Sequence, residues 1–254
     1  MAGASPPRHG EELAAPASPQ RPNGDLAVRL ASAAVMLAIL GFALWRGGAV
    51  LIGLIVAVGL AVFAEYALLV RKIATNDARW AAALVAGAAY IGLGVLALIR
   101  IRGELLVLVL GIVIFTDTGA FFTGRALGGP RIAPRISPSK TWSGLVGGMI
   151  AAALWCAVFV GVIWAAAARL YGGPLQSGAG TPAAAIGIAA AAGAALAVVA
   201  QAGDFFESWL KRRAGVKDSS RLIPGHGGIF DRVDGVLPVA IVVGIVNGIS
   251  GWGH

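Results

Sequence analysis

The chain has 254 residues, of which 58% are hydrophobic and 13% charged, and its mean hydropathy is +0.82. Soluble domains contain about 45–50% apolar residues, so this composition excludes an ordinary soluble domain and indicates an integral membrane protein. The net charge of +8 comes from bases in loops between apolar runs, which argues against nucleic acid as a partner and favours anionic lipid headgroups or phosphate substrates.

Seven apolar runs predict an all-α, polytopic helix bundle in the membrane, with an error of one or two spans. The last run is near the short limit of roughly 17 residues for a span. In chain order the runs are Leu26–Trp45, Ala49–Val70, Trp80–Ile99, Leu105–Phe122, Leu145–Ala168, Pro182–Ala202 and Val236–Trp252.

The distribution of Lys and Arg predicts the orientation, because cytoplasmic loops carry the excess of these residues. Sixteen of the 20 bases fall in alternate loops on one side of the predicted bundle. The other four are Arg46, Arg100, Arg102 and Arg169. The amino terminus is therefore predicted to be cytoplasmic.

The same patterns divide the chain into three parts. Residues 1–24 lack an apolar run and are predicted to form a disordered cytoplasmic tail. Residues 25–122 are predicted to form amino-terminal membrane helices, and residues 123–254 further membrane helices with cytoplasmic catalytic loops at 123–144 and 203–235.

Small residues and the single cysteine bear on packing and assembly. The 37 glycines permit close approach of helices, which makes a homodimer plausible, although small residues serve packing within one chain equally well. Cys156 lies inside an apolar run, so a disulfide within the chain and a four-cysteine metal site are both excluded.

The segment 201–235 holds twelve ionisable side chains between two apolar runs. Burying an unpaired charge costs several kcal/mol or more, so this density at a membrane boundary indicates a site. Asp204 and Glu207 are spaced i, i+3, and so are Asp231 and Asp234, which places each pair on one helical face. Four acids on two helix ends match the oxygen ligands that Mg²⁺ takes together with substrate phosphates and water.

Bases lie between the two acid pairs. Lys211, Arg212, Lys217 and Arg221 are suited to neutralising phosphates, and the glycine-rich stretch 224–228 would let backbone N–H groups approach an anion. The alternative is that these acids and bases pair with one another in a solvated loop.

The order of these residues resembles the signature of the phosphatidate cytidylyltransferases, also called CDP-diacylglycerol synthases. The agreement covers 27 residues: Ser208-x-x-Lys211-Arg212, then Lys217-Asp218, then Pro224-x-His226-Gly227-Gly228-x-x-Asp231-Arg232-x-Asp234. Weaker agreement extends to Phe115–Arg125 and Ile136–Trp142. Ser143 departs from the family pattern, which has an acid there; either Glu65 or Asp117 substitutes for it, or the acid is dispensable.

The resemblance implies a Mg²⁺-dependent reaction of CTP with phosphatidate that gives CDP-diacylglycerol and pyrophosphate in phospholipid biosynthesis. We predict Asp204 and Asp231 as the principal metal ligands, with Glu207 and Asp234 as secondary ligands. Helix capping or local ion pairing is their alternative role.

Further roles follow from the same resemblance. Lys211 and His226 join Asp204, Asp231 and Asp234 as predicted catalytic residues, although His226 between glycines also suits a turn. The predicted substrate-binding residues are Asp117, Ser137, Lys140, Thr141, Ser208, Arg212, Lys217, Arg221 and Arg232. We interpret Glu65 as structural, paired with Arg71 or another base.

The resemblance places the protein in the bacterial inner membrane, among membrane lipids, with its site facing the cytoplasm. A transporter is an alternative, but the ionisable groups gather at one face rather than along a path through the membrane. A CTP-dependent lipid kinase is a second alternative, which the carboxyl-terminal signature disfavours. A purely structural membrane module would not need the polar cluster.

Overall fold

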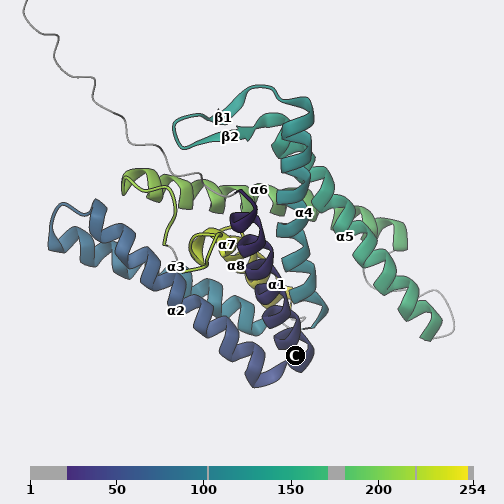
Figure 1. The fold of residues 1–254 in the computed structure, drawn as a ribbon. Coiled ribbons are helices and arrows are strands. Elements are labelled where there is room, and N and C mark those ends of the chain that lie inside the picture. The colour runs from purple at the N-terminus through teal and green to yellow at the C-terminus, as the bar shows by residue number, and fades with distance from the viewer. Residues whose placement is uncertain (1–21, 102, 171–180, 221, 251–254) are drawn as a thin grey trace, which may run out of the picture.

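The computed structural model describes residues 22–101, 103–170, 181–220 and 222–250 (Figure 1). These residues form helices joined by short connections, with one antiparallel hairpin that pairs β1 with β2. The elements are α1 (Pro22–Arg46), α2 (Gly48–Ile73), α3 (Asp77–Arg100), α4 (Glu104–Leu127), β1 (Arg131–Ala133), β2 (Ser137–Thr141), α5 (Trp142–Leu170), α6 (Pro182–Arg213), α7 (Phe230–Val233) and α8 (Val236–Ser250).

The predicted polytopic membrane bundle is confirmed. Six helices, α1 to α6, are long and apolar enough to cross a membrane. The seventh predicted span is the apolar but shorter α8, of 15 residues. At about 1.5 Å per residue α8 falls short of the roughly 30 Å hydrocarbon core, and the predicted run ended at Trp252, outside the described residues.

Two predicted boundaries differ from the structure. The predicted tail lies outside the described residues except for 22–24, which begin α1. The predicted loop 203–235 begins inside α6, which continues to Arg213. Charged side chains end an apolar run without ending a helix, and the chain leaves the helix only near Gly215, whose φ is +69°.

The predicted loop 123–144 is also largely ordered. Helix α4 extends to Leu127, the hairpin follows, and α5 begins at Trp142. Thr141 starts α5, because its hydroxyl oxygen accepts a hydrogen bond from the backbone N–H of Gly144 at 3.1 Å. The hairpin therefore projects from the bundle as a folded element between α4 and α5 (Figure 1).

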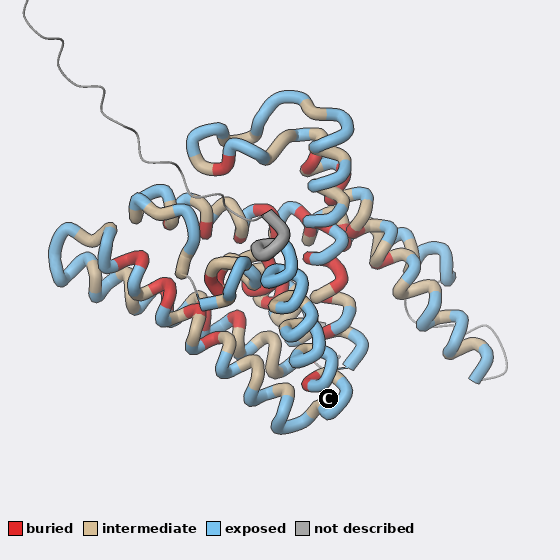
Figure 2. The backbone as a smooth tube through the Cα atoms, viewed as in Figure 1, coloured by how far each residue is buried: buried red, intermediate tan, exposed pale blue. Residues whose placement is uncertain are grey.

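Close helix contacts use small residues, as the glycine content predicts. A Cβ added to Gly193 on α6 would lie 2.6 Å from the carbonyl oxygen of Ala152 on α5. A Cβ on Gly148 of α5 would lie 2.8 Å from the carbonyl oxygen of Thr116 on α4. Buried positions follow these inner helix faces, with Cys156 among them, while the outer faces are exposed (Figure 2). The helices α4, α5 and α6 thus form one tightly packed unit.

Candidate active site

Acidic side chains from three parts of the chain meet beside the hairpin. Asp204 on α6 forms an ion pair with Lys140 on β2, and Lys140 also donates a hydrogen bond to Gln201 at 3.0 Å. Asp117 on α4 and Asp234, between α7 and α8, lie close enough for their charges to interact with this pair. We call these five residues the Asp204 cluster.

A glycine brings Asp234 to this place. A Cβ at Gly203 would lie 2.2 Å from the backbone carbonyl oxygen of Asp234, so the contact requires glycine on α6. Burial, followed by the negative charge of Asp204, raises the pKa of Asp234 to about 8 even though the N–H of Gly235 donates to its carboxyl. The Asp204 cluster thus holds three acids against the single ammonium of Lys140.

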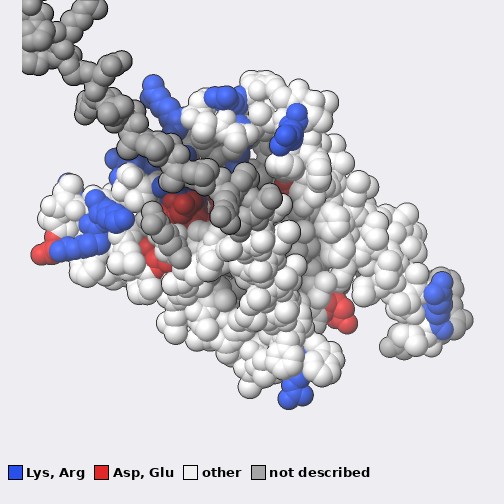
Figure 3. Space-filling model, viewed as in Figure 1, with Lys and Arg blue, Asp and Glu red and all other residues white. Residues whose placement is uncertain are grey.

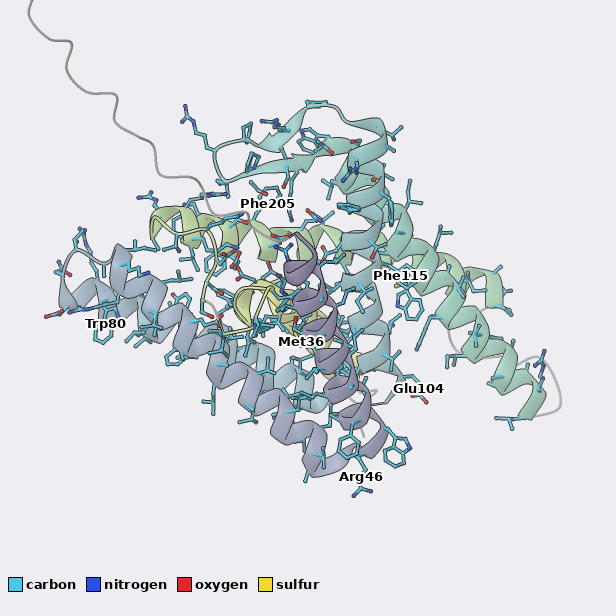
Figure 4. The ribbon with its side chains drawn as sticks, viewed as in Figure 1. Met36, Arg46, Trp80, Glu104, Phe115 and Phe205 are labelled. Atoms are coloured by element: carbon cyan, nitrogen blue, oxygen red, sulfur yellow. The ribbon has the colours of Figure 1, made fainter. Side chains whose placement is uncertain are left out.

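Lys140 is fixed by more than its ion pair. Its ammonium lies 5.0 Å from the ring centre of Phe205, and its side chain is 17% exposed. Figure 4 labels Phe205 on α6, below the hairpin that carries Lys140. The predicted contact of Lys140 with a phosphate would therefore take place between the hairpin and α6, beside the three acids.

A second group of charges lies further along α6. The ammonium of Lys211 is 2.6 Å from Glu207 Oε2 and 2.7 Å from Asp231 Oδ1. Asp231 Oδ2 accepts hydrogen bonds from the N–H groups of Ser219 at 3.1 Å and Gly228 at 2.9 Å. We call these residues the Asp231 cluster.

The Asp231 cluster is tightly paired. Burial alone would raise the pKa of Asp231, but Glu207, Lys211 and the Gly228 N–H together hold that pKa well below its usual range. The side chain of Glu207 is 1% exposed, and Lys211 is the one base that forms an ion pair with it among the described residues. Metal binding through Asp231 Oδ1 would require Lys211 to release it.

The predicted metal ligands therefore fall into two clusters. Asp204 and Asp234 belong to one cluster, and Asp231 and Glu207 to the other. Both predicted i, i+3 pairs are therefore split, and the two predicted principal ligands, Asp204 and Asp231, lie in different clusters. Within the described part of the chain, no three His, Cys, Asp or Glu side chains are grouped so that they alone would hold a metal ion. Metal binding at these acids stays a prediction.

His226 lies in the tight turn that its glycine neighbours predict. Gly225 and Gly227 have φ of +74° and +84°, and Ile223 pairs with Gly227 across the turn. The imidazole Nδ1 lies 2.8 Å from Ser32 Oγ on α1. The Arg232 guanidinium donates to the His226 carbonyl, so Arg232 also supports this turn.

Other predicted substrate residues hold the hairpin in place. Ser137 is buried at the start of β2, and Arg212 donates to the backbone carbonyl of Ile136 at 3.3 Å. Thr141 caps α5, as described above. Ser208 is half-buried on α6, and Lys217 is exposed in the following loop. Arg221 lies outside the described residues.

The predicted pairing of Glu65 with Arg71 or another base is wrong, because its partners among the described residues are serine hydroxyls and backbone N–H groups. Arg71 pairs with Asp77 at 2.9 Å, whereas Glu65 is 4% exposed and accepts hydrogen bonds from the segment that carries the Asp231 cluster. The signal for this role was an acid inside an apolar run, which is costly without a function. Ser143, where the resemblance led us to expect an acid, donates to the carbonyl of Gly128 and contacts Thr141.

Comparison with known proteins identifies the family. The model of the cytidylyltransferase family matches residues 73–249, which is more than half of the chain. The chain belongs to the cytidylyltransferase family. Both clusters lie inside the matched region, and α1 and nearly all of α2 lie outside it.

Individual phosphatidate cytidylyltransferases are also similar to this chain. A phosphatidate cytidylyltransferase of Brucella suis is 43% identical over 164 residues, which cover 62% of this chain and 54% of the relative. Proteins of the same name from Haemophilus influenzae and Pseudomonas aeruginosa are 42% identical over 118 residues and 35% identical over 150 residues. These matches cover 46% and 59% of this chain, and 36% and 49% of the relatives. The matched part thus spans about half or less of these relatives.

Proposed function

We propose that the protein transfers the cytidylyl group of CTP to phosphatidate, giving CDP-diacylglycerol and pyrophosphate. The observation that carries this proposal is the Asp204 cluster, where Asp204 on α6 pairs with Lys140 at one end of a membrane bundle and the charges of Asp117 and Asp234 act on the same place. Relatives in the same family are named for this reaction. We place the site at the cytoplasmic face of a bacterial inner membrane, because most Lys and Arg gather at the end with the hairpin (Figure 3).

The reaction needs positioning and charge neutralisation more than covalent catalysis. A phosphate oxygen of phosphatidate forms a bond to the α-phosphorus of CTP. The bond from that phosphorus to the oxygen bridging the β-phosphorus breaks, and pyrophosphate leaves with the electron pair. Phosphatidate brings its own anionic nucleophile, so the protein has to align two phosphates that repel each other.

The donor set of the Asp204 cluster suits Mg²⁺. This ion uses one or two carboxylates together with substrate phosphates and water, and the cluster has an excess of carboxylates over ammonium groups. Asp204 and Asp234 would hold the ion, with Asp117 beside them. Asp231 and Glu207 stay predicted ligands, although both form ion pairs with Lys211 in the structure. When bound, Mg²⁺ supplies positive charge to the phosphate oxygens.

The bases then divide by place. Lys140 faces the acids and would contact phosphate bound over Asp204. Exposed Arg212 and Lys217 would attract CTP or the lipid headgroup from the surface, as would Arg221.

His226 and Arg232 form the turn beside the Asp231 cluster, where the imidazole would contact a phosphate or carry a proton. The hydroxyl groups of Ser137, Thr141 and Ser208 would bind substrate. A homodimer stays a prediction.

The test is a defined assay with purified protein, CTP, phosphatidate and Mg²⁺ in detergent. We expect pyrophosphate and CDP-lipid from the unaltered protein. For Asp204→Asn we expect a rate of product formation that is at least about 10²-fold lower, because one charge at the reacting phosphates is lost. Asp77→Asn, at an exposed acid on α3, is the matched control and should retain full activity.

The products also decide between the two nucleotide reactions. Release of CDP with a newly phosphorylated lipid, instead of pyrophosphate with CDP-lipid, would show a CTP-dependent kinase. Equal activity of Asp204→Asn and the unaltered protein would remove the Asp204 cluster from the reaction.

A further inference from the structure

A buried acid on α2 contacts the segment that carries the Asp231 cluster. Glu65 is 4% exposed and lies within a helix that precedes the region matched by the family. Helix α7 contacts both α2, which carries Glu65, and α6, which carries Lys211. Glu65 is far in sequence from residues 208–234, which the signature covers, and nothing in that signature assigns a role to Glu65.

All four acceptor directions of the Glu65 carboxylate are used. Oε1 accepts from Ser220 Oγ at 2.6 Å and from the N–H of Ile229 at 2.9 Å. Oε2 accepts from Ser219 Oγ at 2.8 Å and from the N–H of Phe230 at 2.8 Å. The two backbone N–H groups stand at the start of α7, where Ile229 offers no side-chain cap of its own. Glu65 therefore supplies this cap from another helix.

The same contacts lead directly to Asp231. Asp231 is the second residue of α7, so the two amides held by Glu65 immediately precede it. Ser219 lies between the two carboxyl groups: its hydroxyl is 2.8 Å from Glu65 Oε2 and 3.1 Å from Asp231 Oδ2. Its backbone N–H also donates to Asp231 Oδ2, at 3.1 Å. Movement of Glu65 would thus change both the backbone and a hydrogen-bond donor of Asp231.

The glycine of the signature fits this arrangement. A Cβ at Gly228 would lie 1.9 Å from Ser219 Oγ and 2.5 Å from Glu65 Oε2. Gly228 also donates its N–H to Asp231 Oδ2 at 2.9 Å. No side chain fits at residue 228 while Glu65 and Ser219 occupy their places.

We propose that Glu65 is a positioning residue, which holds Asp231 in its orientation toward Lys211 through Ser219, Ile229 and Phe230. The inference deepens the proposed function, since it rests on Asp231 belonging to the active site. Glu65 itself touches neither the reacting groups nor Lys211 in the described contacts.

Substitution of Glu65 by glutamine removes the charge and changes the hydrogen bonding while keeping the size of the side chain. In Glu65→Gln the new side chain has nearly the same shape, but its amide nitrogen replaces one acceptor oxygen by a donor. The backbone N–H next to that nitrogen then faces another donor, whereas the neighbouring serine hydroxyl can turn and accept from it. Leaving a buried donor unpaired costs about 1–3 kcal/mol. The start of α7 should open more often, while the helices of the bundle keep their packing.

The experiment is hydrogen–deuterium exchange on the purified full-length protein, comparing the unaltered chain, Glu65→Gln and Glu104→Gln. Glu104 is an exposed acid in the first turn of α4 and is the matched control. We expect amides 228–231 to exchange at least about tenfold faster in Glu65→Gln, with α3 and α5 unchanged and with no effect of Glu104→Gln. Unchanged exchange at 228–231, or a rise spread equally over all helices, would overturn the proposal.

Activity gives a second readout. Loss of positioning lowers the kcat of the folded protein about tenfold or more, whereas a purely structural Glu65 lowers the melting temperature and leaves the kcat of the folded fraction intact. If Glu65→Gln does not fold, Ser220→Ala removes one of the four contacts, and the same exchange criterion applies with a smaller rise, of about threefold. An unaltered protein without CDP-lipid product would refute the proposed function, whereas the exchange result would still decide on Glu65.

Discussion

Asp234 illustrates how the fold changes the chemistry of a single side chain. Its carboxyl is buried and lies near the negative charges of Asp204 and Asp117, which the positive charge of Lys140 opposes. The pKa is raised to about 8, against about 3.9 for an aspartate in an unfolded chain. Because the folded protein binds this proton more tightly than the unfolded chain does, the free energy of unfolding is highest below the unfolded pKa and falls as pH rises through the folded pKa.

Replacement of Asp234 by asparagine should therefore have a pH-dependent effect on stability. We expect Asp234→Asn to melt close to the unaltered protein near pH 4 and at a higher temperature at pH 8.5, in detergent with a metal chelator present. The reason is that asparagine never has to bear the charge that Asp234 carries at high pH. A difference in melting temperature that is constant between pH 4 and 8.5 would contradict the raised pKa.

Lys140 provides a second test at the same scale. Lys140→Met keeps an unbranched side chain over Phe205 but removes the only ammonium of the Asp204 cluster. We expect kcat/KM for cytidylyl transfer to fall about 10²-fold, because a charge aimed at the reacting phosphates is lost. Lys72→Met, an exposed base at the end of α2, is the control in the same pyrophosphate assay. Equal rates for the two variants would exclude a phosphate contact for Lys140.

The acids of the site are predictable from sequence, but their grouping is not. Asp204, Asp231 and Asp234 follow from spacing and from a family signature, both of which are local along the chain. The approach of Asp234 to Asp204 depends on Gly203 touching the backbone of Asp234, which is a tertiary contact. Glu65 was visible as an acid in an apolar run, yet its partners lie more than 150 residues away in sequence.

At the scale of elements, apolar runs predict where helices exist better than where they end. The runs are local and 3.6-residue periodicity needs no partner, so α1 to α6 follow from hydropathy. Hydropathy marks the membrane boundary, however, and α6 crosses it: Asp204, Glu207 and Lys211 lie on one continuous helix. This continuity fixes the spacing between the two clusters, which a flexible loop would not do.

The packing of α6 against α5 gives a prediction with a control on the same helix. Gly193→Ala should lower the melting temperature, since its Cβ would meet the Ala152 carbonyl at 2.6 Å and overpacking costs about 1–3 kcal/mol. Gly187→Ala has no heavy atom within 4 Å of its Cβ and should raise stability slightly, as alanine does in helices. Thermal unfolding of both variants in detergent measures this. A destabilised Gly187→Ala, or a neutral Gly193→Ala, would argue against the observed contact between α5 and α6.

For the molecule as a whole, the unequal distribution of charge predicts which face meets the cytoplasm. Arg135 lies exposed in the hairpin, between β1 and β2. Arg46 is the exposed last residue of α1, at the opposite end of the bundle in Figure 4. With the buried Cys156 replaced by alanine, single cysteines at these two positions can be probed in intact cells with a maleimide that does not cross membranes. We expect Arg46→Cys to react in intact cells and Arg135→Cys to react only after permeabilisation. The reverse pattern would place both clusters outside the cell, away from any cytoplasmic supply of CTP, and the proposed reaction would then fail through access to its nucleotide even though every side chain of the site was in place.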